Sequence, residues 1–69
     1  MQIILSILLY LNVISSPGTY TTTDIQNDVL NNQAAVSNVQ SNTVLLNYVV
    51  ATYKKQVSSI GVLDDGQMR

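Results

Sequence analysis

The chain has no cysteine and no histidine among its 69 residues. Disulfides are therefore excluded, and so are the common metal sites built from thiolate and imidazole ligands. A chain this short buries a modest core and usually needs a disulfide, a metal ion or oligomerisation for stability. Because the first two are excluded here, we expect the chain to self-associate.

Charge is also scarce. Charged residues make up 10% of the chain, the formal net charge is −1, and no residue between Val29 and Tyr53 is charged. Nucleic-acid binding requires a basic face, so we expect no nucleic-acid partner. Solubility must come from Asn, Gln, Ser and Thr, which together supply 26 residues.

Catalytic chemistry has little support. Without histidine, cysteine or a phosphate-binding loop, the usual pairs of nucleophile and base cannot form. The acidic pair Asp64-Asp65 precedes Gly66 in a turn signal, and a calcium ion would need more oxygen ligands than these two residues offer. Lys54 and Lys55 suit a helix end better than a phosphate site. We therefore expect no enzyme activity, cofactor or metal.

The strongest pattern lies in residues 24–60, where apolar residues recur at alternating spacings of four and three. This 3.5-residue repeat is typical of a left-handed coiled coil. The fold class it predicts is all-α, with one long helix over residues 24–60 in a parallel coiled coil. β-Branched residues at both core positions favour a homotrimer over a dimer. The expected oligomerisation residues are Ile25, Val29, Asn32, Val36, Val39, Thr43, Leu46, Val50, Tyr53, Val57 and Ile60.

Both ends of this helix carry signals. Thr23 and Gln26 fit a capping box at the start, and Gly61 is a typical residue just beyond a helix end. Two polar residues interrupt the core stripe. Asn32 could fix the register of the coil or could mark a loose point, and we favour register control. Thr43 is interpreted as a tolerated replacement for valine.

Residues 1–14 form a nearly unbroken apolar run. Three interpretations remain open: a retained anchor for a membrane or partner, a secretory signal, and a simple core segment. The run is short for a transmembrane helix, and it lacks the basic residues that begin a signal. The expected anchor residues are Ile3, Ile4, Leu5, Ile7, Leu8, Leu9, Leu11 and Ile14.

These patterns divide the chain into four parts. Residues 1–16 are the anchor or signal-like segment, 17–23 a linker rich in Pro, Gly and Thr, 24–60 the coiled-coil helix, and 61–69 a C-terminal turn and tail. The linker could also extend as a strand in a partner's sheet.

The stretch Val44–Tyr53 is apolar on nearly every side of the expected helix. A helix of this kind is normally buried, so we expect a second contact surface here, facing other subunits of an assembly. Ten residues are too few for a membrane span.

The resulting functional hypothesis is a non-enzymatic structural protein: a self-associating coiled-coil stalk with an apolar N-terminal anchor. The uncharged, amide-rich composition resembles that of viral and phage fibre stalks. The order of apolar segment, Thr-rich linker and heptads is similar to class I viral fusion subunits. Two alternatives stay open, a membrane-active fusion or pore-forming segment and a helical subunit of a filament or capsid shell. The expected location is extracellular, in a virion or membrane-associated.

Overall fold

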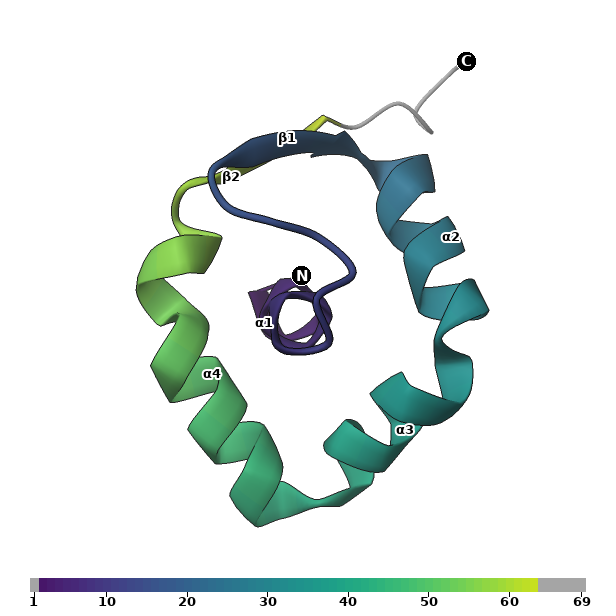
Figure 1. Cartoon of the computed structure of the whole chain (residues 1–69), viewed down its shortest axis with the longest axis vertical. Coiled ribbons are helices and arrows are strands. Elements are labelled where there is room, and N and C mark those ends of the chain that lie inside the picture. The colour runs from purple at the N-terminus through teal and green to yellow at the C-terminus, as the bar shows by residue number, and fades with distance from the viewer. Residues whose placement is uncertain (1, 64–69) are drawn as a thin grey trace.

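The computed structural model describes residues 2–63. Within this range the chain forms four short helices and one parallel pair of strands (Figure 1). The elements, in chain order, are α1 (Gln2–Tyr10), β1 (Gly18–Thr21), α2 (Thr22–Asn31), α3 (Gln33–Ser41), α4 (Thr43–Val57) and β2 (Ile60–Leu63).

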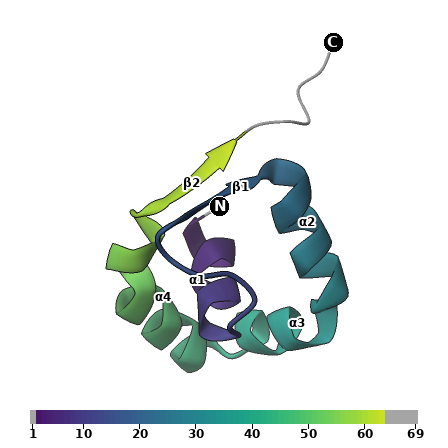
Figure 2. The same cartoon turned by 45° about the horizontal axis from the view of Figure 1, so that its top comes forward.

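Helix α1 lies at the centre of the molecule. The other helices and the two strands form a ring around it, and the turned view shows α1 between α4 and α2 (Figures 1 and 2). Its residues 5–9 are all buried, and Ile7 and Leu8 have no exposed surface. The nearly all-apolar sequence of α1 therefore matches its central position, because residues 5–9 contact neighbours on every side of the helix.

Two local features shape α1. The buried Ser6 hydroxyl donates to the Gln2 carbonyl oxygen at 2.9 Å, so no polar atom is left without a partner there. The chain leaves the helix after Tyr10, and Asn12 just beyond the end has a left-handed φ of 62°. The amide of the next residue, Val13, then donates to the Leu8 carbonyl oxygen at 2.9 Å. This is the bond pattern of a Schellman motif, with asparagine in the position that glycine most often takes.

The turn that leads into β1 is tightly packed. The Tyr20 hydroxyl accepts a hydrogen bond from the Ser15 amide at 3.1 Å. Gly18 lies inside this turn, where a Cβ atom would be 3.0 Å from the Ser15 carbonyl oxygen and 3.1 Å from the Tyr20 ring. A side chain at this position would require these neighbouring atoms to shift by a few tenths of an ångström.

Strands β1 and β2 close the ring. They pair in parallel from Gly18 opposite Ile60 to Thr21 opposite Leu63. Gly61 therefore lies inside a strand, and the prediction that it follows the end of the long helix is wrong, since α4 stops at Val57. The β-branched Thr-rich segment does extend, but its strand pairs within its own chain.

Helix α2 begins earlier than the sequence suggested. Thr21 is the N-cap, and its hydroxyl accepts from the Asp24 amide at 3.0 Å while the Asp24 carboxylate accepts from the Thr21 amide at 3.1 Å. The expected capping box of Thr23 and Gln26 is therefore wrong by two residues. Both pairs fit the same spacing rule, but β1 fixes Thr21 in the extended conformation that an N-cap requires.

Two asparagines divide the expected long helix into three. Asn32 follows α2 and precedes α3, and its side-chain amide donates to the Asp28 carbonyl oxygen at 2.8 Å. Asn42 is the N-cap of α4, and its side-chain oxygen accepts from the Leu45 amide at 3.1 Å. Asparagine competes for backbone hydrogen bonds and so ends helices readily. The prediction of one continuous helix over residues 24–60 is therefore wrong.

The parallel coiled coil and the homotrimer are wrong with it, and so is the viral fibre that depended on them. The apolar stripe of residues 24–60 faces α1 of the same chain, so an internal helix takes the place of partner chains. A repeat of 3.5 residues drifts from an ideal helix by only about 20° per heptad. Over helices this short the stripe therefore stays on one side of the helix, and no supercoiling is needed.

The membrane-anchor prediction for residues 1–14 is corrected as well, because this segment supplies the central core helix. Among the helices of residues 2–63, none has the length and apolar character needed to cross a bilayer. The turn expected at Asp64-Asp65-Gly66 lies outside the described residues.

Candidate functional site

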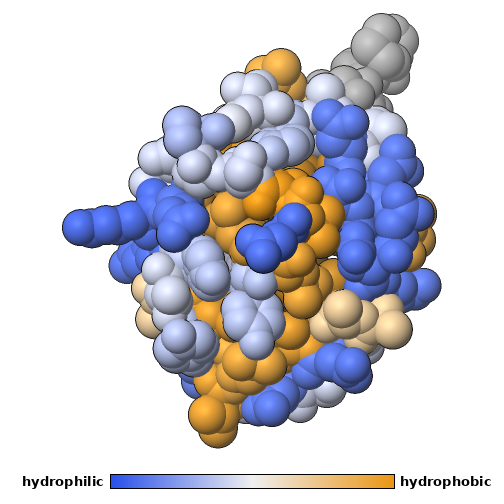
Figure 3. Space-filling model, in the orientation of Figure 1, coloured by the Kyte–Doolittle hydropathy of each residue, from blue (hydrophilic) through white to orange (hydrophobic). Residues whose placement is uncertain are grey.

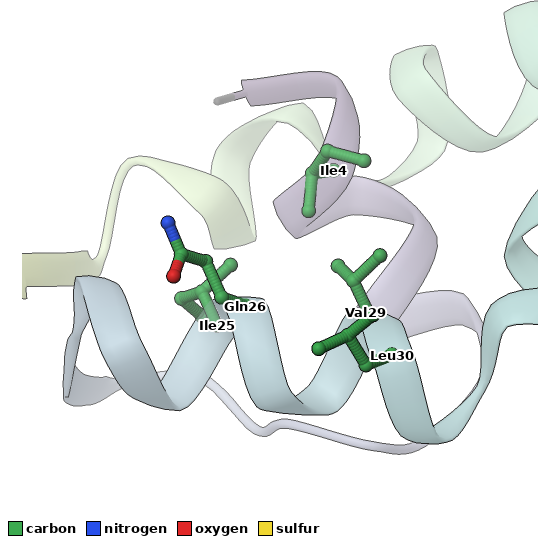
Figure 4. A pocket seen from close by; sticks show the side chains of 5 residues that line it. All are labelled: Ile4, Ile25, Gln26, Val29 and Leu30. Carbon is green, nitrogen blue, oxygen red and sulfur yellow. The ribbon is translucent and has the colours of Figure 1, made fainter.

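An apolar groove runs between α1 and α2 (Figure 4). It has a volume of about 490 Å³. In the view of Figure 3, apolar surface occupies the middle of this face of the molecule, over α1, with polar side chains on either side. The groove is lined by Ile4 of α1 and by Ile25, Gln26, Val29 and Leu30 of α2.

Helix periodicity places these side chains. Ile25 and Val29 lie one turn apart on the face of α2 that packs toward α1, and Ile25 is buried in the core. Gln26 and Leu30 lie one residue further round, also one turn apart, and form the outer wall. Leu30 is 64% exposed, so the groove has an apolar wall that remains open to solvent.

The chemistry of the groove is simple. The lining includes no charged side chain, and its one polar side chain is the amide of Gln26. An amide can donate and accept hydrogen bonds, but it cannot act as a general acid or base at neutral pH. The groove therefore suits an apolar group that carries one hydrogen-bonding atom.

A second apolar surface lies on the outer face of α4. We define this outer face as Val44, Tyr48, Ala51 and Thr52, which share one side of the helix and are all exposed. Val44 is 81% exposed and Tyr48 is 60% exposed. Neither side chain contributes to the core.

The opposite face of α4 packs inward. Val49 has no exposed surface, and Leu45, Leu46 and Tyr53 pack against the core. The Tyr53 ring meets the Tyr10 ring of α1 edge-on, with centroids 6.5 Å apart and planes at 70°. The excess of apolar residues in Val44–Tyr53 is therefore divided between a buried face and an exposed one.

The residues expected to drive oligomerisation mostly pack inside the fold of a single chain. Ile25, Val36 and Val39 are buried, whereas Asn32 and Val50 are half-buried and Thr43 is exposed. The remaining members of the stripe are partly buried against the core: Val29, Leu46, Tyr53, Val57 and Ile60.

The expected anchor residues also lie mostly in the core. Ile3 is exposed, and Ile4 and Leu11 are partly buried. The other five are buried: Leu5, Ile7, Leu8, Leu9 and Ile14. Of the whole set, Ile4 also lines the groove.

Gln26 and Leu30 are the groove residues that the sequence analysis missed. Leu30 falls outside the expected stripe, and a large apolar residue on the outer side of a polar helix was the available signal. Gln26 was considered in the sequence analysis as the second residue of the expected capping box with Thr23. Neither residue reveals from sequence that α1 supplies the facing wall.

The described residues offer no alternative centre for metal chemistry, since residues 2–63 contain no group of three or more acidic side chains that could hold a metal ion. A scan against protein-family models, a search of curated proteins and a search of solved structures found no match to this chain. The function is therefore inferred from the two apolar surfaces.

Proposed function

We propose that this chain is a non-enzymatic assembly subunit, which packs against neighbouring copies through the outer face of α4. The exposure of Val44 and Tyr48 is the observation that supports this function. Single exposed apolar residues are ordinary on protein surfaces. Here two large apolar side chains, Val44 and Tyr48, lie one turn apart on a face of α4 whose first charged residue is Lys55. The pair therefore forms one contact surface.

The fold itself does not require these two side chains. The inner face of α4 already covers α1 through Val49 and its neighbours. Burying Val44 and Tyr48 against another molecule would gain about 25 cal/mol for each Å² of apolar surface removed from water. The uncharged flanks mean that no ion loses its hydration in the contact.

The membrane-active alternative receives less support. It would require α1 to leave the core, because residues 5–9 are buried. Assembly through α4 requires no rearrangement of the fold, since the outer face is already exposed. We therefore retain the assembly subunit as the proposed function.

Sedimentation velocity of the full chain over a wide range of concentration tests this function. We expect the weight-average mass of the wild-type protein to rise with concentration. Val44→Asp and Tyr48→Asp should each remain monomeric with unchanged far-UV circular dichroism, because a carboxylate on the outer face cannot be buried without a partner.

The matched control is Gln40→Glu, which adds a negative charge at an exposed position of α3, outside α4. This variant should associate like the wild type. A wild-type chain that stays monomeric throughout, or an outer-face variant that associates normally, would reject the proposed function.

A further inference from the structure

We propose that residues 18–31, which are strand β1 and helix α2, form a flap over α1, and that β2 is the strap that holds this flap closed. Separation of β2 from β1 lets the flap swing away from α1 about Ser16 and Asn32. The groove between α1 and α2 is the edge at which the flap opens. The motion does not involve the outer face of α4, so it goes beyond the proposed function and does not depend on it.

The flap contributes little to the core. Among residues 2–63, nine apolar side chains are buried, and Ile25 is the one that belongs to the flap. Two further flap residues, Tyr20 and Val29, are only partly buried against the core. The groove of about 490 Å³ leaves the contact of α2 with α1 incomplete, so fewer dispersion contacts are lost when the two helices separate.

The strap is held by a short sheet. Within residues 2–63, β1 and β2 are four residues each and form a sheet of two strands. None of the side chains of β2 is fully buried: Ile60 and Val62 pack partly against the core, and Leu63 is 58% exposed. A sheet of only two strands is marginally stable in water. Separation of β2 therefore costs less free energy than unfolding of the core.

The strap and α2 are directly linked. Thr21 is the last residue of β1 and also the N-cap of α2, so no residue between the two elements can absorb a movement (Figure 2). The hydroxyl of Thr22, the first residue of α2, donates to the Leu63 carbonyl oxygen of β2 at 3.1 Å. Pairing with β2 therefore fixes Thr21 in the extended conformation and sets the direction in which α2 leaves the sheet.

The two ends of the flap are suited to act as hinges. Before the flap, the Ser16 hydroxyl donates to the Gln56 carbonyl oxygen at 2.9 Å and holds the chain to the end of α4. After the flap, the Asn32 side chain donates back to the Asp28 carbonyl oxygen of α2 at 2.8 Å and makes no cap hydrogen bond to α3. Asn42, by contrast, caps α4 with its side chain. The junction of α2 with α3 is therefore less firmly fixed than the junction of α3 with α4.

Opening of the flap also unfolds α2. This helix has ten residues, and isolated helices of that length are marginal in water. A flap that leaves α1 therefore loses its helical hydrogen bonds, and its amides exchange with solvent, whereas α1, α3 and α4 stay packed. Opening is thus a sub-global step whose free-energy cost is below that of global unfolding.

The main experiment locks the strap to the flap with a disulfide in the full chain. Thr19 and Gly61 are both exposed and lie opposite each other in the sheet. A Cβ atom at Gly61 would be 3.6 Å from the Thr19 hydroxyl oxygen, so Thr19→Cys combined with Gly61→Cys brings two cysteines within the range of a disulfide. The chain has no other cysteine, so the reduced form of the same variant is the matched control.

The measurement is native-state hydrogen exchange, which compares the backbone amides of Val29 and Leu30 in α2 with that of Leu8 in α1. In the reduced form we expect the α2 amides to be protected at least tenfold less than the Leu8 amide. In the oxidised form this difference should fall below threefold, because the disulfide holds β2 beside β1. The comparison is made within each form, so the general stabilisation that a disulfide provides does not enter it.

Two matched valine variants test the same point without a cross-link. Val62→Ala removes methyl groups that attach the strap and should speed exchange of the α2 amides about fivefold. Val49→Ala weakens the part of the core that stays folded when the flap opens. This variant should speed exchange at Leu8 and leave the α2 amides unchanged.

Two kinds of result would overturn the proposal. Equal protection of α2 and Leu8 in the reduced form would show that no flap opens before the whole chain unfolds. A difference that persists in the oxidised form, or unchanged exchange of α2 in Val62→Ala, would show that α2 opens without release of β2.

Discussion

Helix α1 and the Val44–Tyr53 stretch of α4 are both apolar on nearly every side, yet they occupy different positions in the fold. Helix α1 lies inside the ring, and residues 5–9 are buried without a break. Helix α4 forms part of the ring, so Val49 is buried whereas Val44 is 81% exposed. An all-round apolar sequence therefore has two distinct causes: contact on every side within one chain, or a surplus face available to another molecule.

The largest expected effect comes from shortening a side chain at the centre of the ring. Leu8→Ala removes buried methyl groups from α1 and should lower the free energy of unfolding by about 2–5 kcal/mol. Total stability for a chain of this length is roughly 3–10 kcal/mol, so this variant should be close to unfolding. Urea denaturation followed by circular dichroism measures the change.

The control for that variant is Ile3→Ala in the same helix. Ile3 is 47% exposed, so its truncation should lower the free energy of unfolding by less than about 1 kcal/mol. Equal losses for Leu8→Ala and Ile3→Ala would contradict the central position of α1.

An intermediate effect separates the two faces of α4. Val49→Ala and Val44→Ala delete the same atoms from two faces of the same helix. We expect a loss of about 2 kcal/mol for the buried Val49 and a change within about 0.5 kcal/mol for Val44, measured in dilute solution where the chain is monomeric. Similar losses at both positions would show that the outer face belongs to the core.

The smallest effect concerns the ends of the two helices. Helix α1 has no charged residue in its first or last turn, whereas the last turn of α4 carries Lys54 and Lys55. These lysines interact favourably with the negative end of the α4 dipole. Replacing both by glutamine should lower the free energy of unfolding by about 0.6 kcal/mol at low ionic strength.

Salt provides the check on that small effect. The loss should disappear at high ionic strength, where exposed charges are screened. The double replacement by arginine keeps both charges and should preserve stability at all salt concentrations. A loss that persists at high salt would assign the effect to packing of the lysine side chains.

The sequence predicted which side of residues 24–60 is apolar, but it could not identify what covers that side. Ile25, Val36 and Val39 are buried, and their spacing alone indicated a common face. A periodic stripe reports burial and carries no information about whether the partner is another chain or another segment. Here the partner is α1, whose apolar run also fits an anchor or a signal.

The helix boundaries failed for a local reason. Residues 24–60 contain no glycine or proline, so the strongest markers of a break are absent. The polar clusters around Asn32 and Asn42 were the available signals, because asparagine caps helices through its side chain. The groove could not be predicted from the sequence, because its walls come from two helices and no local sequence pattern encodes their contact.

Native-state hydrogen exchange in dilute solution tests the central position of α1 most directly. The amides of Leu11 and Val13 donate to the carbonyl oxygens of Ile7 and Leu8, each at 2.9 Å, and these bonds close the end of the central helix. We expect the amides of Leu8, Leu9 and Leu11 to be among the slowest to exchange, with protection close to that of global unfolding. Rapid exchange at these amides, with slow exchange retained in α2 to α4, would show that α1 is not the core of the fold.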